Sequence, residues 1–362
     1  MNRNFLAMVT TVLVIPSFVL LLYCVFSENM PAESLLPASP AWGAERESIA
    51  GRADSENSEK PLQTQKLPDT EGKGASERVA WEGASERVAW EVGSMRLLLD
   101  ADGQPAALQT AILTYTIPPV SGDDRSAVSS EYAGLRVDLI AAVHIGDRRY
   151  YQVLNSLFRQ YDSVLYELVA KKGSRPPKPV KGQKRQPSSL LSAVQLMFGE
   201  ILGLQFQLEE IDYTPSNFVH ADLSPEQFNA AMQERNDGMA RMLGRMLGYQ
   251  LAAGPGKSSD AELFAALLSS DPQQRLRRFF AGSMADADRL TDILDAGGEN
   301  GSAIITARNA AAIEVLRERM EAGDHRIAVF YGGAHSPDFE KRFAEEFGLA
   351  HTATHWLTAW SL

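Results

Sequence analysis

The chain has 362 residues, of which 44% are hydrophobic and 22% charged, and its formal net charge at pH 7 is −11. This composition is typical of a folded globular protein and excludes collagen-like and wholly disordered chains. The net acidity argues against a nucleic-acid partner, because such a partner requires a basic surface. The single cysteine, Cys24, excludes an intramolecular disulfide and a cysteine-based zinc cluster, so any metal has to be bound by histidine and carboxylate.

The chain begins with a short polar stretch, residues 1–4, and an apolar stretch, residues 5–26. As a helix rising about 1.5 Å per residue, the apolar stretch would reach about 33 Å, which is enough to cross a bilayer core. Arg3 precedes it and no basic residue follows until Arg46, which predicts a cytoplasmic N-terminus. We favour an uncleaved signal anchor over a signal peptide. The expected protein is a single-pass membrane protein with its bulk extracytoplasmic, or a secreted one if the segment is cleaved.

Residues 27–94 are predicted to form a disordered linker, because they are rich in Glu, Ser, Ala, Gly and Pro and poor in large apolar residues. Within this segment the sequence GASERVAWE occurs twice in tandem, at 74–82 and 83–91. Two copies are too few for a solenoid. Trp81 and Trp90 allow the repeat to be read as a docking motif, but a duplication tolerated in a linker is the simpler interpretation, and no function is assigned to it.

Residues 95–362 are predicted to form one α/β domain. Its first half alternates strands with a helix: strands at 108–117, 137–143 and 163–169, and a helix at 148–161. A large helical insertion follows, with helices expected at about 190–210, 225–251, 261–268, 273–294 and 304–322. A strand at 326–330, a helix at 337–347 and a strand within 351–360 close the chain. The expected fold is a mixed or mostly parallel central sheet with a large helical insertion.

Two apolar strands of this domain are each followed by a histidine and then by a helix. The first reads Ala141-Ala142-Val143-His144 and the second Gly332-Gly333-Ala334-His335. Ligands in α/β sheets gather at the carboxyl ends of strands, so both histidines are candidates for a site. Glu167 lies in an otherwise apolar strand, where a buried carboxylate needs a cation or a metal as its partner. Two imidazoles and one carboxylate suit a catalytic divalent metal site, although a satisfied structural role is the alternative for each.

These motifs resemble those of the TraB/GumN/PrgY family, which includes the Tiki metalloproteases. The stretch AAVHIGDRRYYQVLNSLFRQYDSVLYEL is similar to the first block of the family, a Gly-x-x-His motif followed by a strand that contains Glu. The stretch ARNAAAIEVLRERMEAGDHRIAVFYGGAH is similar to the second block, an Arg followed by another Gly-x-x-His motif, and HWLTAW fits the closing strand. The likeness covers about residues 134–170 and 300–362. One position departs from the pattern, since Ala141 stands where the family has glycine.

The resemblance implies that His144 and His335 are metal ligands and that Glu167 is a third ligand or the general base. It also implies that Arg308 faces the same site, where a guanidinium can hold a substrate carboxylate or stabilise developing negative charge. The alternative for Arg308 is a structural ion pair with Glu167, which would compete with metal ligation. For the metal, the family suggests manganese or cobalt, and the ligand types also allow zinc.

Three further residues are secondary candidates. His220 and Asp222 precede a helix that is predicted to start at Pro225 after a Ser cap, and they could add ligands or a proton shuttle; a role in helix entry is the alternative. His355 lies on the last strand and could approach the site from there, although packing is its default role.

Two functions remain open. The first is a membrane-anchored, extracytoplasmic, metal-dependent hydrolase that acts on a peptide or protein substrate. The second is a non-catalytic protein that binds and sequesters a peptide signal, as pheromone-shutdown members of the family are thought to do. The four retained polar residues, His144, Glu167, Arg308 and His335, favour the first function, and the missing glycine at position 141 favours the second.

Overall fold

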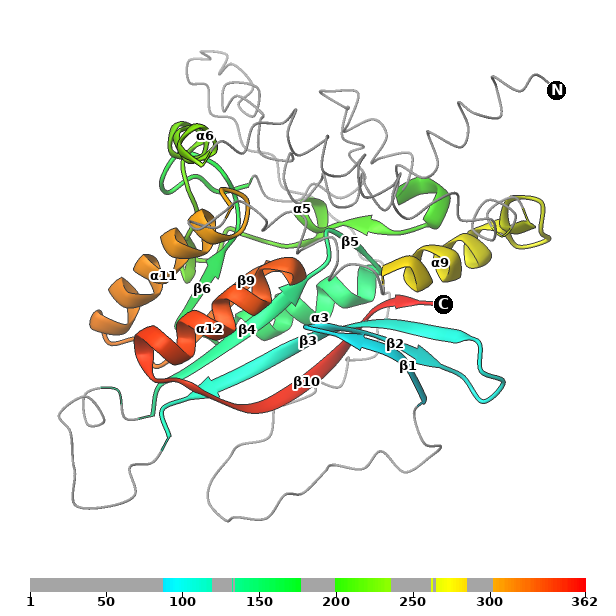
Figure 1. The fold of residues 1–362 in the computed structure, drawn as a ribbon, viewed down its shortest axis with the longest axis horizontal. Helices are drawn as coiled ribbons and strands as arrows, with labels where there is room; N and C mark the ends of the chain where they lie inside the picture. Colours follow the sequence, from blue (N-terminus) through cyan, green and yellow to red (C-terminus); the bar gives the residue numbers. More distant parts are fainter. Residues whose placement is uncertain are drawn as a thin grey trace, which may run out of the picture. The chain divides into compact units, whose positions relative to one another are not determined.

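In the computed structural model, a mixed sheet that comprises eight strands among the described residues forms the centre of the fold (Figure 1). The described residues are 87–118, 132, 134–176, 199–235, 262, 265–284 and 302–362, and all of them belong to one compact unit. The predicted anchor at 5–26 lies outside them, as do the first repeat copy at 74–82 and most of the predicted linker. Within the described ranges, no helix is long and apolar enough to span a membrane.

The sheet has a parallel part and an antiparallel part. The parallel part runs, in spatial order, through β4 (Arg136–Ala142), β9 (Arg326–Gly332), β6 (Ser163–Tyr166) and β8 (Phe218–His220). The antiparallel part contains β1 (Arg87–Val92), β2 (Met95–Leu99), β3 (Pro105–Thr116) and β10 (Ala350–Ser361). The long strand β3 joins the two parts. Along one edge it pairs first with β2 and then with β4, and along its other edge it pairs with β10. The predicted mixed α/β sheet is confirmed.

The predicted strand–helix–strand unit forms, but its two strands are not neighbours. Strand β4, helix α3 (Arg148–Phe158) and strand β6 follow one another as expected. Strand β9 lies between β4 and β6 and pairs in parallel with both, so that Phe330 is level with Ile140 on one side and Tyr166 on the other. Nearly every residue of β9 is buried, as is expected for a strand at the centre of a sheet that is covered on both faces. As a result, the carboxyl ends of β4, β9 and β6 meet at one edge of the sheet.

Helices cover both faces of the sheet, and the alternation along β9 shows which side chains meet them. Val329 and Tyr331 belong to a core that includes residues of α11 (Thr306–Glu321) and α12 (Ser336–Phe347). Phe330, on the opposite face, packs against Phe158 of α3, with ring centroids 4.8 Å apart. Figure 1 shows α11 and α12 side by side in front of the strands. The arrangement is therefore helix, sheet, helix.

The described parts of the predicted helical insertion contain short elements. These are β7 (Gln205–Phe206), which pairs with β5 (Ile145–Gly146), and the helices α5 (Gln207–Glu210), α6 (Pro225–Glu234) and α9 (Pro272–Ser283). The predicted start of α6 is confirmed, because Ser224 accepts a hydrogen bond from the backbone N–H of Gln227 and the Gln227 side chain accepts one from the backbone N–H of Ser224. The remaining parts of the predicted helices at 190–210, 225–251 and 273–294 lie outside the described residues.

The folded domain begins earlier than the predicted boundary at residue 95. Strand β1 starts at Arg87 and pairs antiparallel with β2, with Trp90 opposite Leu97. The end of the second repeat copy is thus part of the sheet, and the assignment of residues 87–94 to a disordered linker is wrong. The β-forming residues Val88 and Trp90 favour a strand locally, whereas the linker prediction relied on the average composition of a much longer segment.

Arg277 of α9 connects the loop after β4 with the end of the chain. Its guanidinium donates to Asp147 Oδ1 (3.0 Å) and to the carbonyl oxygens of Gly203 (2.9 Å) and Ser361 (3.1 Å). Asp147 Oδ2 in turn accepts from the backbone N–H of Ser361 at 2.6 Å. The Arg277 side chain is only 9% exposed. This network holds the backbone directly after His144 against β10.

We expect Arg277→Met to lower the free energy of unfolding by about 3 kcal/mol, because it leaves a partly buried carboxylate and several carbonyl groups without their donor. Arg275→Met, at an exposed position of the same helix, should change it by less than about 0.5 kcal/mol. Denaturant unfolding of both variants beside the parent protein measures the difference. Similar losses in the two variants would show that the network contributes little.

Candidate functional site

His144, Glu167 and His335 converge where the carboxyl ends of β4, β6 and β9 meet. His144 follows β4 by two residues, Glu167 comes directly after β6, and His335 ends the short 3₁₀ helix η3 (Gly333–His335) that continues from β9. The three surround Gly332: a methyl group on its Cα would lie 3.4 Å from Glu167 Oε2, 3.5 Å from His144 Nε2 and 3.8 Å from His335 Cδ2. The absence of a side chain at Gly332 therefore leaves space between them.

The φ of Gly332 is −53°, which other residues also adopt, so this glycine is needed for space and not for conformation. Ala141, the position that departs from the family pattern, lies inside β4 and pairs with Tyr331. A strand conformation is open to alanine, so the departure places no strain on the backbone before His144.

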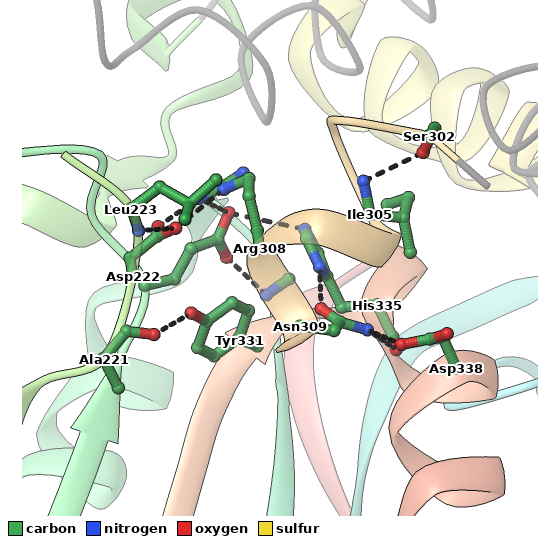
Figure 2. Close-up of polar contacts among 12 residues, drawn as sticks. Ala221, Asp222, Leu223, Ser302, Ile305, Arg308, Asn309, Tyr331, His335 and Asp338 are labelled. Carbon is green, nitrogen blue, oxygen red and sulfur yellow. Dashed lines mark hydrogen bonds and ion pairs between the residues drawn. The ribbon is translucent and has the colours of Figure 1, made fainter. Parts of the chain in front are cut away.

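Arg308 connects Glu167 with Asp222, as Figure 2 shows for its contacts with Asp222. It projects from the first turn of α11 and is fully buried. Its Nη2 lies 2.9 Å from Glu167 Oε1, and its Nε and Nη2 donate to the two carboxylate oxygens of Asp222 at 3.0 and 2.5 Å. The ion pair with Glu167 that the sequence raised as an alternative is thus present, and Asp222 adds a bidentate contact to it.

Glu167 is ionised at neutral pH. Burial alone raises the pKa of Glu167, but the positive charge of Arg308, the two histidines and a hydrogen bond from the backbone N–H of Gly332 to Oε2 (2.7 Å) together lower it to about 2. The site therefore contains a permanent buried carboxylate.

His335 is buried between Asn309 and Glu167. Its Nδ1 lies 2.6 Å from Asn309 Oδ1, while its Nε2 has no hydrogen-bond partner among the described residues and lies 3.6 Å from Glu167 Oε1. Burial lowers the pKa of His335 to about 3, although the charge of Glu167 acts in the opposite direction. The ring is therefore neutral at pH 7, and Nε2 faces the carboxylate.

His144 lies at the more accessible side of the site. Part of the residue is exposed, but its Nε2 is buried. Burial lowers the pKa of His144, against the opposing effects of Glu167 and of a hydrogen bond with the Gln207 side chain. Gln207 also donates its backbone N–H to the His144 carbonyl at 2.9 Å. Gln207 thus contacts His144 through both its backbone and its side chain.

The secondary candidates have different positions. Asp222 belongs to the site through Arg308, as an ion-pair partner. His220 places its Nε2 2.6 Å from the carbonyl oxygen of Leu168, so it connects the end of β8 with the segment after β6. His355 pairs with Ile112 on β10, and because β3 lies between β10 and β4, it is about 10 Å to the side of β4.

Sequence reasoning missed one residue that shapes the site, Asn309, whereas Gly332 was already part of the second histidine motif. Asn309 directly follows Arg308 in α11 and contacts both His335 and Asp338. Asparagine is unfavourable inside helices, because its side chain competes with the backbone for hydrogen bonds. An asparagine in the first turn of a predicted helix, next to the arginine that the family resemblance singles out, is the signal that points to it.

Within the described ranges, no group of three or more His, Cys, Asp or Glu side chains already forms a metal-binding arrangement, so a metal bound by His144, His335 and Glu167 would require their side chains to move. Comparison of the chain with models of protein families, with curated proteins and with solved structures finds no match in any of the three. The chemistry of the site is therefore inferred from its own geometry.

Proposed function

We propose that this chain is a metal-dependent hydrolase that acts on peptides, with His144, His335 and Glu167 around one divalent cation. The observation that carries the proposal is the pair His335 Nε2 and Glu167 Oε1, which are 3.6 Å apart in side chains that are 1% and 5% exposed. This distance is too long for a hydrogen bond. Two ligand atoms about 2.1 Å from a tetrahedral metal are about 3.4 Å apart, so the spacing fits two neighbouring ligands.

The charges of the site also favour a cation. Glu167 and Asp222 carry two negative charges, and Arg308 carries one positive charge, so the buried cluster has an excess of one negative charge beside two imidazoles. Buried charge that is not balanced is costly, and a bound cation would balance it. The space beside Gly332, which a methyl group would fill, is adjacent to all three proposed ligands.

The side chains have separate roles in this proposal. A divalent ion bound here would lower the pKa of a water molecule and polarise the substrate carbonyl. With a pKa of about 2, Glu167 is a weak base at neutral pH, which supports a role as ligand over a role as general base. Arg308, held by Asp222, keeps Glu167 ionised and supplies positive charge next to the reacting groups. Manganese and cobalt are the proposed metals from the family resemblance, and zinc from the ligand types.

A second function, the non-catalytic binding of a peptide, is favoured by the contact between Arg308 and Glu167. Arg308 Nη2 already lies 2.9 Å from Glu167 Oε1, where it would compete with a metal. In that case the polar cluster is structural, and the protein binds its peptide without cleaving it. For both functions, anchoring through residues 5–26 and an extracytoplasmic location remain part of the proposal.

Metal content decides between the two functions. We expect the purified full chain, offered manganese, cobalt or zinc, to retain about one ion per chain, and His144→Ala and His335→Ala each to retain none. His325→Ala, at an exposed position at the start of β9, should behave like the parent protein and serves as the control. No retained ion under any of these conditions would reject the hydrolase, and chelator-insensitive peptide binding without turnover would support the second function.

Gly332→Ala tests the space between the ligands without removing a ligand. The added methyl group meets its neighbours at 3.4 to 3.8 Å, which are ordinary contact distances, so we expect the thermal stability of the metal-free protein to change little. Its metal affinity should fall about 10-fold or more, because the methyl group enters the coordination space. An unchanged affinity in this variant would show that the cation does not bind next to Gly332.

A further inference from the structure

We infer that Asn309 is a positioning residue for His335: it determines which ring nitrogen carries the proton and directs the lone pair of Nε2 toward Glu167. The value of this orientation for metal binding rests on the proposed function. The orientation itself follows from the hydrogen bonds around Asn309 and can be measured in the metal-free protein.

The contacts of Asn309 fix the direction of its amide group (Figure 2). Its Nδ2 donates to Asp338 Oδ2 at 2.8 Å and to the carbonyl oxygen of His335 at 3.1 Å. Both partners are acceptors only, so Nδ2 has to face them, and Oδ1 is left to face His335 Nδ1 at 2.6 Å. Asp338 is held in turn by Arg342, whose Nε donates to the same Oδ2 at 2.7 Å.

This arrangement determines the tautomer of His335. An amide oxygen can only accept a hydrogen bond, so His335 Nδ1 has to carry the proton. A neutral imidazole has one N–H, and its Nε2 therefore carries a lone pair. Nε2 is the atom that lies 3.6 Å from Glu167 Oε1 and has no hydrogen-bond partner among the described residues. Histidines that bind metals nearly always donate their other N–H to an acceptor of this kind.

The position of Asn309 in the fold explains how one helix contacts both Glu167 and His335. Arg308 and Asn309 are consecutive residues in the first turn of α11, and consecutive helical residues point about 100° apart. Arg308 contacts Glu167 while Asn309 contacts His335, and both side chains are fully buried. Through Asp338, Asn309 also connects α11 with α12. A purely structural role in this helix contact is the alternative that an experiment has to exclude.

The tautomer of His335 can be read directly by NMR of the full chain labelled with ¹⁵N-histidine, because protonated and unprotonated ring nitrogens differ widely in chemical shift. We expect the metal-free parent protein to show His335 with the proton on Nδ1. Asn309→Ala should give a mixture of tautomers and weaken the binding of the metal, measured by calorimetry with manganese, about 10- to 100-fold. The double variant Asn309→Asp, Asp338→Asn loses the donor to the His335 carbonyl oxygen but keeps an acceptor facing His335 Nδ1 and a donor between the two positions, so it should restore the proton on Nδ1.

Asn217→Ala is the matched control. Asn217 is a part-buried asparagine whose Nδ2 donates to the carbonyl oxygens of Phe158 and Tyr161 near the start of β8, away from the site. Its loss should destabilise the protein without changing the tautomer of His335 or the metal affinity. A purely structural role of Asn309 predicts the same outcome for Asn309→Ala, and that result would overturn the inference.

The remaining outcomes are also decisive. If the parent protein binds no metal but Asn309→Ala still changes the tautomer, the proposed function fails and the positioning role stands. If Asn309→Ala does not fold, the parent protein and the double variant decide, because a proton on Nε2 of His335 in either of them would overturn the inference.

Discussion

Arg308→Met should lower the free energy of unfolding by about 3 to 5 kcal/mol at neutral pH. Arg308 is fully buried, and its guanidinium is the cation in contact with the carboxylates of Glu167 and Asp222, whose side chains are 5% and 0% exposed. Methionine fills a similar volume but leaves two negative charges buried next to each other without their counterion. The loss is large because the remaining partners cannot return to water.

The loss should become smaller in acid. Without the guanidinium, burial raises the pKa of Glu167 with less opposition, so this carboxyl group takes up a proton at a higher pH than in the parent protein. Denaturant unfolding at about pH 7 and pH 5 measures the difference between parent and variant. Arg317→Met, which removes an exposed ion pair with Glu346 on α12, is the control, with an expected loss below about 1 kcal/mol. A loss of the same small size in Arg308→Met would contradict the buried ion-pair network.

The sequence predicted those parts of the site that depend on local pattern. His144 and His335 each follow an apolar strand, and parallel strands bring their carboxyl ends to one edge, so their convergence could be expected. Glu167 stood out as a carboxylate in an apolar segment, and the structure places it directly after β6. Its partner Arg308 came from the family resemblance and from the need of a buried carboxylate for a cation.

The remaining parts depend on pairing between distant segments, which local pattern does not reveal. β9 lies between β4 and β6 although it is more than a hundred residues later in the chain, and this insertion brings Gly332 next to Glu167. The contact of Asp222 with Arg308 requires the β8 segment to meet α11. His355 shows the same limit, since its place on the last strand could be predicted, but not that β3 would separate it from the site.

The stability of the metal-free protein should fall steeply as the pH drops below about 6.5. The folded-state pKa values of His144 and His335 are both lowered, that of His335 to about 3. Below the ordinary pKa of histidine, the unfolded chain therefore takes up protons that the folded protein excludes. Each buried histidine then costs up to about 1.4 kcal/mol of stability per pH unit. Glu167 adds to the loss between its ordinary pKa of about 4.3 and its folded value of about 2.

Denaturant unfolding of the chelator-treated protein at about pH 7, 6 and 5 gives this slope, and His335→Gln isolates the contribution of one ring. Glutamine keeps an amide in place of the imidazole but does not titrate, so between pH 6 and pH 5 the variant should lose about 1 kcal/mol less than the parent protein. Groups that titrate elsewhere in the chain contribute equally to both proteins and cancel in the comparison. Equal slopes would mean that His335 takes up a proton as readily in the folded protein as in the unfolded chain. In that case a protonated His335 could itself balance the charge of Glu167, and the argument that a bound cation is needed beside Glu167 would lose its basis.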